Sequence, residues 1–197
     1  MAITDPDYPV PSRLTTDEFV LRPIRPTDAL ADFEAVMETR EHLRLWEQSA
    51  WPADDFTVEG NRDDLVGLEE RHDAHYAYTY TVVDPAGAEA LGCVYVFPTG
   101  AKFLARSEVT PLGDERWSDV EAVVYLWVRR SRMDAGLDAR LLPALRSWFA
   151  DEWKLSRVVF VTNERFEQQV ALIERTDLRR RFELREPGKA GTYLVYG

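Results

Sequence analysis

The stretch EAVVYLWVRRSRMDAGLDARLL, Glu121–Leu142, contains the pattern that decides the fold. Its first part, Glu121–Val128, is apolar at almost every position, as expected for a strand buried on both faces of a sheet. A helix is predicted from Asp138 to about Trp153, because apolar residues recur there at helical spacing: Leu141, Leu142, Leu145, Trp148 and Phe149. Arg157–Asn163 then reads as a strand, and a strand–helix–strand crossover of this kind makes the two strands parallel neighbours.

The rest of the chain supplies further strands and helices around this unit. Alternating apolar residues predict strands at Phe19–Arg25, Ala77–Asp84 and Ala90–Phe97, and at the closing segments RFELRE (181–186) and TYLVYG (192–197). Helices are predicted at Ala29–Arg44, Val58–Asp73 and Phe166–Arg175, the first with Leu30, Phe33, Val36 and Met37 on its apolar stripe. The predicted fold class is α/β (α+β), with a mixed central sheet of about seven strands flanked by helices on both faces.

The chain divides into an arm and one domain. Residues 1–17 are rich in proline and predict an extended N-terminal arm, and residues 18–197 predict a single domain. Residues 98–119 form a polar connection that is longer than most loops of a compact domain, so we consider it a candidate lid or dimer element.

Composition restricts the classes of function. The net charge of −11 argues against binding of nucleic acid and is compatible with a cationic substrate such as an amine, or with solubility alone. The sequence has no apolar run long enough for a membrane helix and no signal peptide, so a cytoplasmic location is expected. The single cysteine, Cys93, lies in an apolar strand and is interpreted as a buried, inert thiol.

A cluster of charges marks the junction between the predicted central strand and the helix after it. Arg129, Arg130, Arg132 and Arg140 outnumber two aspartates, Asp134 and Asp138, around a single glycine, Gly136. A helix N-terminus at such a junction attracts anions. The alternative is that these arginines pair with the two aspartates and with acidic residues elsewhere on the surface.

This order of elements, with these motifs, resembles the GCN5-related N-acetyltransferases (GNAT), and the resemblance extends from Phe19 to Gly197. The opening LRPIRPTDA is similar to the first strand and helix cap of that superfamily, and the hairpin before Val128 is similar to its central sheet. The loop after Val128 occupies the place of the acetyl-coenzyme A signature Arg/Gln-x-x-Gly-x-Gly/Ala. On Met133–Asp138 only Gly136 matches it, so the chain resembles a divergent bacterial member with a degraded signature.

The resemblance implies acetyl-coenzyme A as acetyl donor and no metal. The residues that it assigns to the coenzyme are Trp127, Val128, Arg130, Arg132, Ala135, Gly136, Leu137, Asp138, Ala139, Arg140 and Asn163. Asp138 opposes this assignment, because a carboxylate about 5 Å from a phosphate is repelled by roughly 3 kcal/mol at an effective dielectric of about 20. Asp138 is also a candidate N-cap of its own helix, and Asn163 fits a turn equally well.

The resemblance also suggests catalytic and acceptor residues. Glu121 is at about the place of the glutamate that acts as base in many GNAT enzymes, although an acid at the start of a strand is often only solvated. The tyrosine that commonly protonates the leaving thiolate is replaced by Ile173. Trp46, Trp51 and Tyr95 are candidates for the wall of the acceptor pocket, with core or lid packing as the alternative.

The function predicted from the sequence is transfer of an acetyl group from acetyl-coenzyme A to a primary amine of a small molecule or peptide. The alternative is a catalytically inactive protein of the same fold that binds or regulates a partner. No nucleic acid and no membrane are expected as partners, and a homodimer remains a hypothesis.

Overall fold

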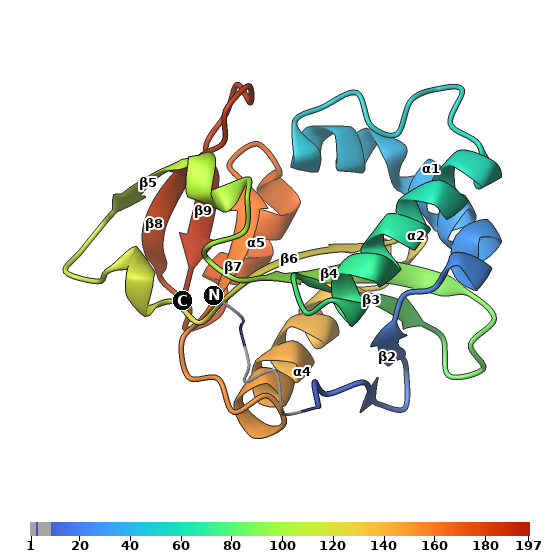
Figure 1. Cartoon of the computed structure of the whole chain (residues 1–197), viewed down its shortest axis with the longest axis horizontal. Helices are drawn as coiled ribbons and strands as arrows, with labels where there is room; N and C mark the ends of the chain where they lie inside the picture. The colour runs from blue at the N-terminus through green and yellow to red at the C-terminus, as the bar shows by residue number, and fades with distance from the viewer. Residues whose placement is uncertain (1–2, 4–8) are drawn as a thin grey trace.

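The computed structural model describes residue 3 and residues 9–197, and within them the strands form one mixed sheet (Figure 1). Its strands are β1 (Leu14–Thr15), β2 (Val20–Pro23), β3 (Tyr78–Val83), β4 (Ala90–Phe97), β5 (Glu108–Pro111), β6 (Ala122–Val128), β7 (Val158–Asn163), β8 (Arg180–Arg185) and β9 (Tyr193–Tyr196). Across the sheet the order is β1-β2-β3-β4-β6-β7-β9-β8-β5. The predicted fold class is confirmed, and the short edge strands β1 and β5 bring the described strands to nine rather than about seven.

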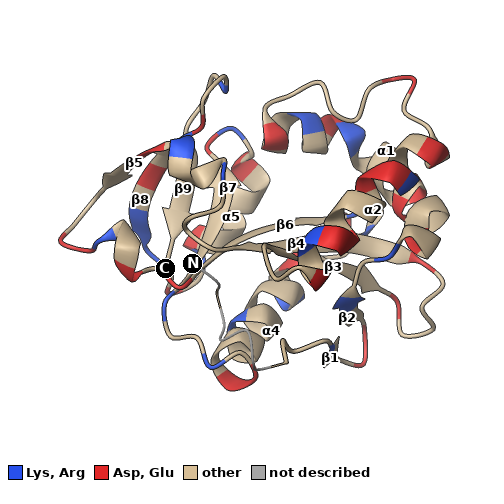
Figure 2. Cartoon of the chain, viewed as in Figure 1, with Lys and Arg blue, Asp and Glu red and all other residues tan. Residues whose placement is uncertain are grey.

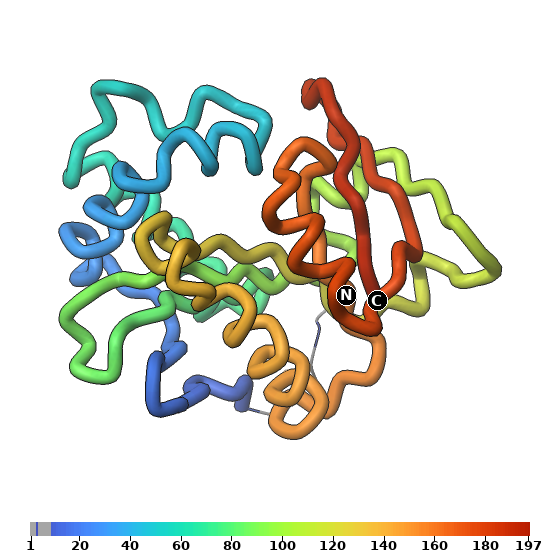
Figure 3. The backbone as a smooth tube through the Cα atoms, turned by 180° about the vertical axis from the view of Figure 1, so that it is seen from behind, coloured from blue at the N-terminus to red at the C-terminus, as the bar shows by residue number. Residues whose placement is uncertain are grey.

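Helices cover both faces of this sheet, as predicted. They are α1 (Ala29–Glu47), α2 (Val58–Asp73), α3 (Arg130–Asp134), α4 (Leu137–Asp151) and α5 (Glu167–Glu174). Buried residues of α1 and α2 belong to the core on one face, and those of α4 and α5 belong to the core on the other. Seen from behind, the end of α1 approaches the start of α5 (Figure 3), where the His42 and Phe166 rings lie 5.4 Å apart.

Strand β6 is the centre of the molecule. Its residues alternate between the two cores: Val124 and Leu126 pack on the side of α4, while Val123, Tyr125 and Trp127 pack on the side of α1. All seven residues of β6 are buried, which explains why the strand is apolar at every position. Cys93 on the neighbouring β4 is 1% exposed, as expected for a thiol in this sheet.

Strands β6 and β7 are parallel, as the crossover predicted, but they pair over only part of their length. The register runs from Ala122↔Val158 to Tyr125↔Val161, although β6 continues to Val128 and β7 to Asn163. Beyond Tyr125 and Val161 the two strands diverge (Figure 1). This divergence leaves backbone groups of β6 and β7 facing a gap near the middle of the sheet.

Two segments are more ordered than the sequence suggested. The connection 98–119 contains β5, which pairs with β8, together with two 3-10 turns, Leu104–Arg106 and Trp117–Asp119. The predicted N-terminal arm contributes β1, which pairs with β2, and the Tyr80 hydroxyl donates to the carbonyl of Pro11 at 2.7 Å. Residues 1–2 and 4–8 of the arm lie outside the described residues.

Charged residues of both signs are interspersed over the helices and loops (Figure 2). In this view, lysines and arginines alternate with acidic residues along several of the elements. Among the described residues, we find no helix with the length and apolar character needed to cross a bilayer.

The buried stripe of α1 differs from the predicted one. Leu30, expected on the apolar face, is 61% exposed, whereas Asp32 is 4% exposed. The Asn61 side-chain amide of α2 donates to the Asp32 carboxylate and to the carbonyl of Ala29, both at 3.0 Å. A polar contact therefore joins α1 to α2, and burial raises the pKa of Asp32 to about 6.

This buried carboxyl makes stability depend on pH. The folded state holds the Asp32 proton more tightly than the unfolded state, so the contribution of Asp32 to stability is lost as pH rises through about 6. We expect the free energy of unfolding of the wild type to fall relative to Asp32→Asn by roughly 2–3 kcal/mol between about pH 3 and pH 7.

Urea unfolding of both proteins across this range measures the difference. Asp63→Asn, an exposed change on α2, is the control for loss of a negative charge. Parallel stability curves for the wild type and Asp32→Asn would show that Asp32 titrates normally.

Candidate active site

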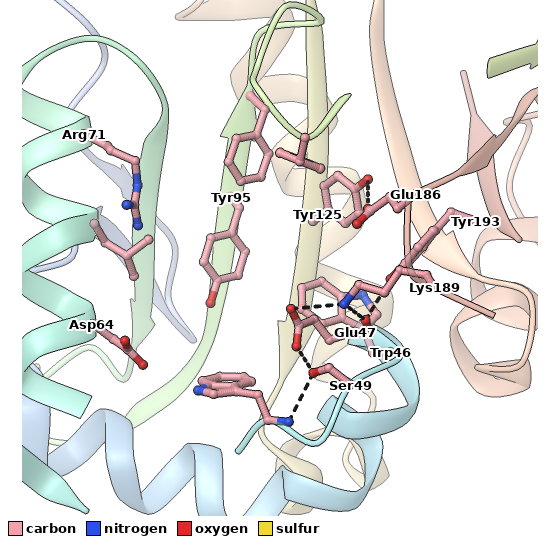
Figure 4. A pocket seen from close by; sticks show the side chains of 14 residues that line it. Trp46, Glu47, Ser49, Asp64, Arg71, Tyr95, Tyr125, Glu186, Lys189 and Tyr193 are labelled. Carbon is pink, nitrogen blue, oxygen red and sulfur yellow. Dashed lines mark hydrogen bonds and ion pairs between the residues drawn. The ribbon is translucent and has the colours of Figure 1, made fainter. Parts of the chain in front are cut away.

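A cavity of about 640 Å³ opens on the α1–α2 side of the sheet (Figure 4). This volume is within the range of roughly 300–1,000 Å³ that is typical for sites of small ligands. Aromatic rings form most of its wall, with several charged groups among them. The lining residues are Trp46, Glu47, Ser49, Trp51, Asp64, Leu68, Arg71, Tyr95, Phe97, Phe103, Tyr125, Glu186, Lys189 and Tyr193.

Helix α2 supplies one wall of the cavity. Asp64, Leu68 and Arg71 are spaced by four and three residues, so they lie on one face of the helix, and all three line the cavity. Asn61 and Leu65 on the neighbouring face are buried. This wall is not among the predicted site residues, although the 64–68–71 spacing shows that the three side chains share a helix face.

The opposite wall comes from the end of α1 and the loop between β8 and β9. Gln48, the left-handed C-cap of α1, bonds both backbone groups of Gly191 through its side-chain amide. Lys189 donates to the Glu47 carbonyl at 2.5 Å, and the Tyr193 hydroxyl donates to the same oxygen at 3.0 Å. These bonds attach the β8–β9 loop to the end of α1, so the two segments hold this wall of the cavity together.

A carboxylate lies in this fixed wall. The Tyr125 hydroxyl donates to Glu186 Oε1 at 3.4 Å, at the position where β6 and β7 stop pairing. Burial raises the pKa of Glu186, although the charge of Lys189 opposes the shift. Burial also raises the pKa of Tyr125, so its hydroxyl stays protonated. No local pattern around Glu186 signals this placement, which depends on the pairing of β8 with β9.

The structure brings together all three predicted pocket residues, Trp46, Trp51 and Tyr95, on the wall of this cavity. The Trp46 ring lies 6.1 Å from the rings of both Tyr95 and Tyr125. The indole N–H of Trp127, on the neighbouring strand β6, donates to the Tyr95 hydroxyl at 3.3 Å. Their positions agree with a binding surface, and their contact with an acceptor stays a prediction.

The gap between β6 and β7 begins after Tyr125, which also lines the cavity. The Gln169 side-chain amide of α5 reaches into it and donates to the carbonyl of Leu126 at 2.9 Å. The Gln169 carbonyl oxygen is buried and has no hydrogen-bond partner among the described residues, and the same holds for the Trp46 indole nitrogen. Five further buried side-chain atoms of the described residues also lack a partner, so the absence of a partner does not by itself mark a site; the Gln169 oxygen is the acceptor that the gap offers to a ligand with amides. Trp127 and Val128, predicted to border the coenzyme, lie on this part of β6.

The predicted loop after β6 is helical. Arg130–Asp134 form α3, and α1 binds its first turn: Thr39 Oγ1 accepts from the Arg130 amide at 3.0 Å, and Glu38 accepts from the Ser131 amide at 2.9 Å. Two amides at the start of this helix are therefore already bonded to side chains of α1.

Most of the arginines of this region are paired inside the protein. Arg129 pairs with Glu38 at 2.6 Å and with Glu89 at 3.3 Å, and Arg132 also pairs with Glu89. The hydrogen bonds from Ser131 and Arg129 lower the pKa of Glu38, against its desolvation. The alternative considered for the arginine cluster, pairing with surface acids, therefore describes these two arginines.

Arg140 and Arg130 differ in their surroundings. Arg140 pairs with Glu18 and also donates to the carbonyls of Ala135 and Gly136, at 3.1 and 2.9 Å. The Arg130 guanidinium has no ion pair among the described residues. Of the four arginines, only Arg130 is therefore without an ion pair among the described residues. The charges counted in the sequence predict a larger positive surplus.

Gly136 adopts the left-handed conformation, with φ of 73°, and is the N-cap of α4. The prediction that Asp138 caps this helix is wrong, because α4 begins at Leu137 and Asp138 is its second residue. Asp138 is 5% exposed; its carboxylate accepts from Gln168 of α5 and from the Ala139 amide. Asp138 therefore occupies the Ala139 amide, which an anion bound at the start of α4 would need. Leu137, also predicted to border the coenzyme, is buried in the core.

The remaining two predicted residues lie apart from the cavity. Asn163 is fully buried; its amide donates to the Leu45 carbonyl at 2.6 Å, and its oxygen accepts from the Arg165 amide. This favours the turn interpretation of Asn163 over contact with a coenzyme. Glu121 accepts three hydrogen bonds from Ser156 and Arg157 and does not line the cavity. That Glu121 acts as the catalytic base stays a prediction, and its three hydrogen bonds and its place outside the cavity do not favour it.

Solved acetyltransferases have the same architecture. RimL, a ribosomal L7/L12 alpha-N-protein acetyltransferase in complex with coenzyme A, matches with a TM-score of 0.67 at 16% identity, over 93% of this chain and 94% of that chain. The ribosomal-protein-S5-alanine acetyltransferase of Vibrio fischeri matches with a TM-score of 0.66 at 20% identity, over 94% and 95%. The microcin C7 self-immunity acetyltransferase MccE, in complex with acetyl-coenzyme A and AMP, matches with a TM-score of 0.67 at 13% identity, over 92% of each chain.

At these identities the likeness shows the fold, which is that of the GNAT acetyltransferases. The resemblance inferred from the sequence is thereby confirmed at the level of architecture. No family model and no curated protein matches the chain in sequence.

The hydrogen bonds of Glu121 predict a structural role. They lower the pKa of Glu121 against its desolvation, so the contribution of the carboxylate to stability is lost as pH falls. We expect Glu121→Gln to lower the free energy of unfolding at pH 7 by about 1 kcal/mol, measured by urea unfolding. Glu152→Gln, an exposed change near the end of α4, is the control. A Glu121→Gln protein as stable as the wild type would contradict this role.

Proposed function

We propose that this protein transfers an acetyl group from acetyl-coenzyme A to a primary amine held in the aromatic cavity. The observation that carries the proposal is the junction at Tyr125. There the parallel strands β6 and β7 separate, and the gap between them meets a cavity that contains the carboxylate Glu186. The likeness in fold to acetyltransferases that were solved with coenzyme A or acetyl-coenzyme A supports the choice of donor.

The residues around the gap fit the donor at its thioester end better than at its phosphate end. The unpartnered oxygen of Gln169 and the backbone of Leu126 to Val128 suit an arm with amide groups. At the phosphate end, Gly136 permits the tight turn before α4 and Arg130 is the free cation, while Asp138 and the paired arginines oppose an anion. We therefore expect the donor to bind with modest affinity.

The chemistry asked of the protein is limited to positioning and to removal of the first of two protons that leave the amine nitrogen. Acetyl-coenzyme A supplies an activated acyl group. We assign Glu186 as the base that removes a proton from the bound ammonium, because it lies beside Tyr125, where the gap meets the cavity, and burial raises its pKa. Burial also raises the pKa of Asp64, but Asp64 lies on the opposite wall. The amine nitrogen then bonds to the carbonyl carbon as the carbon–sulfur bond breaks, and the second proton of the acylated nitrogen passes through water to the leaving thiolate. Ile173, buried in the core, provides no acid for that last step.

Calorimetric titration with acetyl-coenzyme A tests the donor. We expect saturable binding with a dissociation constant in the micromolar to low millimolar range, because most nearby arginines are already paired. Gln169→Leu removes the polar group in the gap without changing its size greatly, and it should weaken binding about tenfold. Glu167→Gln, an exposed change in the first turn of α5, is the control. Absence of binding by the wild type at millimolar concentration would refute the enzyme hypothesis.

Thiol release with a panel of primary amines tests the base. We expect Glu186→Gln to lower kcat/KM about 100-fold or more, with unchanged affinity for acetyl-coenzyme A. In the wild type, kcat/KM should rise with pH through a pKa above the ordinary glutamate value, because only the carboxylate form accepts a proton. This pH step should vanish in Glu186→Gln and persist in Glu183→Gln, a control on the adjacent β8. Unchanged turnover of Glu186→Gln would remove Glu186 from the mechanism.

A specific set of contacts also supports the alternative, a binding or regulatory protein without catalysis. Glu38, Glu89 and Glu18 neutralise three of the four arginines, and Asp138 bonds the Ala139 amide at the helix start. If acetyl-coenzyme A fails to bind while small molecules still bind in the aromatic cavity, this second function is the one that remains.

A further inference from the structure

The charges in the cavity are unevenly paired. Lys189 is paired with Glu47 at 3.5 Å, Glu186 accepts from Tyr125, and Asp64 interacts with the Trp51 indole. Arg71 alone among the charged lining residues has no ion pair and no side-chain hydrogen bond within the described part of the chain. The charge of Asp64 acts on Arg71 without an ion pair between them, so the hydrogen-bond donors of the Arg71 guanidinium are left to a ligand or to solvent.

The position of Arg71 is defined by α2. It continues the face formed by Asp64 and Leu68, and its guanidinium lies beside Gly67, where a Cβ would be 3.5 Å from Arg71 Nη1. In Figure 4, Arg71 and Glu186 stand on opposite walls, with Tyr95 between them. A ligand that meets both must carry opposite charges at its two ends.

We propose that the acceptor is an elongated aminocarboxylate of about dipeptide length, with its amine at Glu186 and its carboxylate at Arg71. This assignment rests on the proposed function and adds the substrate class. An extended dipeptide spans roughly 7 Å at about 3.3–3.6 Å per residue, whereas a free α-amino acid carries both charged groups on one carbon atom, so the longer molecule is better suited to groups on opposite walls. The aromatic wall of Trp46, Tyr95 and Tyr125 favours an apolar side chain between the two ends.

Arg71 is better suited than Lys189 to this carboxylate. A guanidinium binds a carboxylate with two parallel hydrogen bonds, and Arg71 breaks no side-chain hydrogen bond or ion pair of the described residues when it does so. Lys189 would have to leave Glu47, and its bond to the Glu47 carbonyl helps to hold the β8–β9 loop. The side of the cavity formed by α2 is therefore assigned to the anionic end of the acceptor.

Calorimetry with the dipeptide Ala-Phe and its C-terminal amide tests this assignment directly, with and without saturating coenzyme A. The wild type should bind Ala-Phe about tenfold more tightly than the amide. Arg71→Gln should remove this preference by weakening only Ala-Phe, while Arg62→Gln, on α2 but outside the cavity, should retain it. Equal affinity of the wild type for both peptides, equal weakening of both by Arg71→Gln, or no binding of either would overturn the proposal. Free phenylalanine binding as tightly as Ala-Phe would also overturn it, because it would place both charges on one wall.

Thiol release with the same two peptides separates this inference from the proposed function. Binding that depends on Arg71, without acetylation of either peptide, would refute the acetyltransferase and leave the aminocarboxylate site in place. Acetylation of both peptides with the same kcat/KM would support the acetyltransferase and refute the role of Arg71. That outcome would favour, as the acceptor, the N-terminal amine of a longer peptide or protein whose C-terminal carboxylate lies outside the cavity.

Discussion

The loss of backbone pairing between β6 and β7 beyond Tyr125 and Val161 is the constraint on which the site depends. Inside a sheet, unpaired backbone groups must find other partners, because burying them without one is costly. Gln169 provides a partner for the Leu126 carbonyl, and its own oxygen is left without one. On the other face, Tyr125 and the neighbouring aromatic rings begin the cavity where the pairing ends. A single interruption of the sheet thus places a polar gap and an aromatic cavity side by side.

Carboxylates of this acidic chain have different roles that depend on burial and partners. Glu38 and Glu89 are bound by arginines and keep the turn after β6 attached to α1 and to the loop before β4. Asp32 is buried against Asn61 and has its pKa raised by burial. Glu186 is partly buried in the wall of the cavity, where its raised pKa suits proton transfer. The net charge of −11 therefore does not describe the site, whose local pairing determines which charges are available.

The main differences between expectation and structure arise from contacts between residues distant in sequence. Glu121 starts its strand as expected, but the turn before β7 folds back and bonds its carboxylate through Ser156 and Arg157. Asp138 precedes an apolar helix stripe as an N-cap would, yet α4 starts one residue earlier, at Leu137, and α5 supplies Gln168 as a partner. The spacing of Leu30 predicts a core position, but Leu30 is exposed and Asp32 is buried against Asn61 of α2 instead. In each case the local pattern was readable and a distant side chain decided the outcome.

The sequence by itself determined the central parallel pair, the hairpin before it and helices on both faces, because hydrophobic periodicity depends only on which positions must be buried. It also placed Trp46, Trp51 and Tyr95 near one another, through the resemblance to an acetyltransferase fold. Only the tertiary structure decided which charges are free. Arg129, Arg132 and Arg140 are paired by glutamates from elsewhere in the chain, whereas Arg71 and Glu186 face the cavity from opposite walls. The physical reason is that the energy of an ion pair depends on the distance between its two charges in space. Local sequence patterns do not encode this distance for segments as far apart in the chain as α2 and the β8–β9 loop.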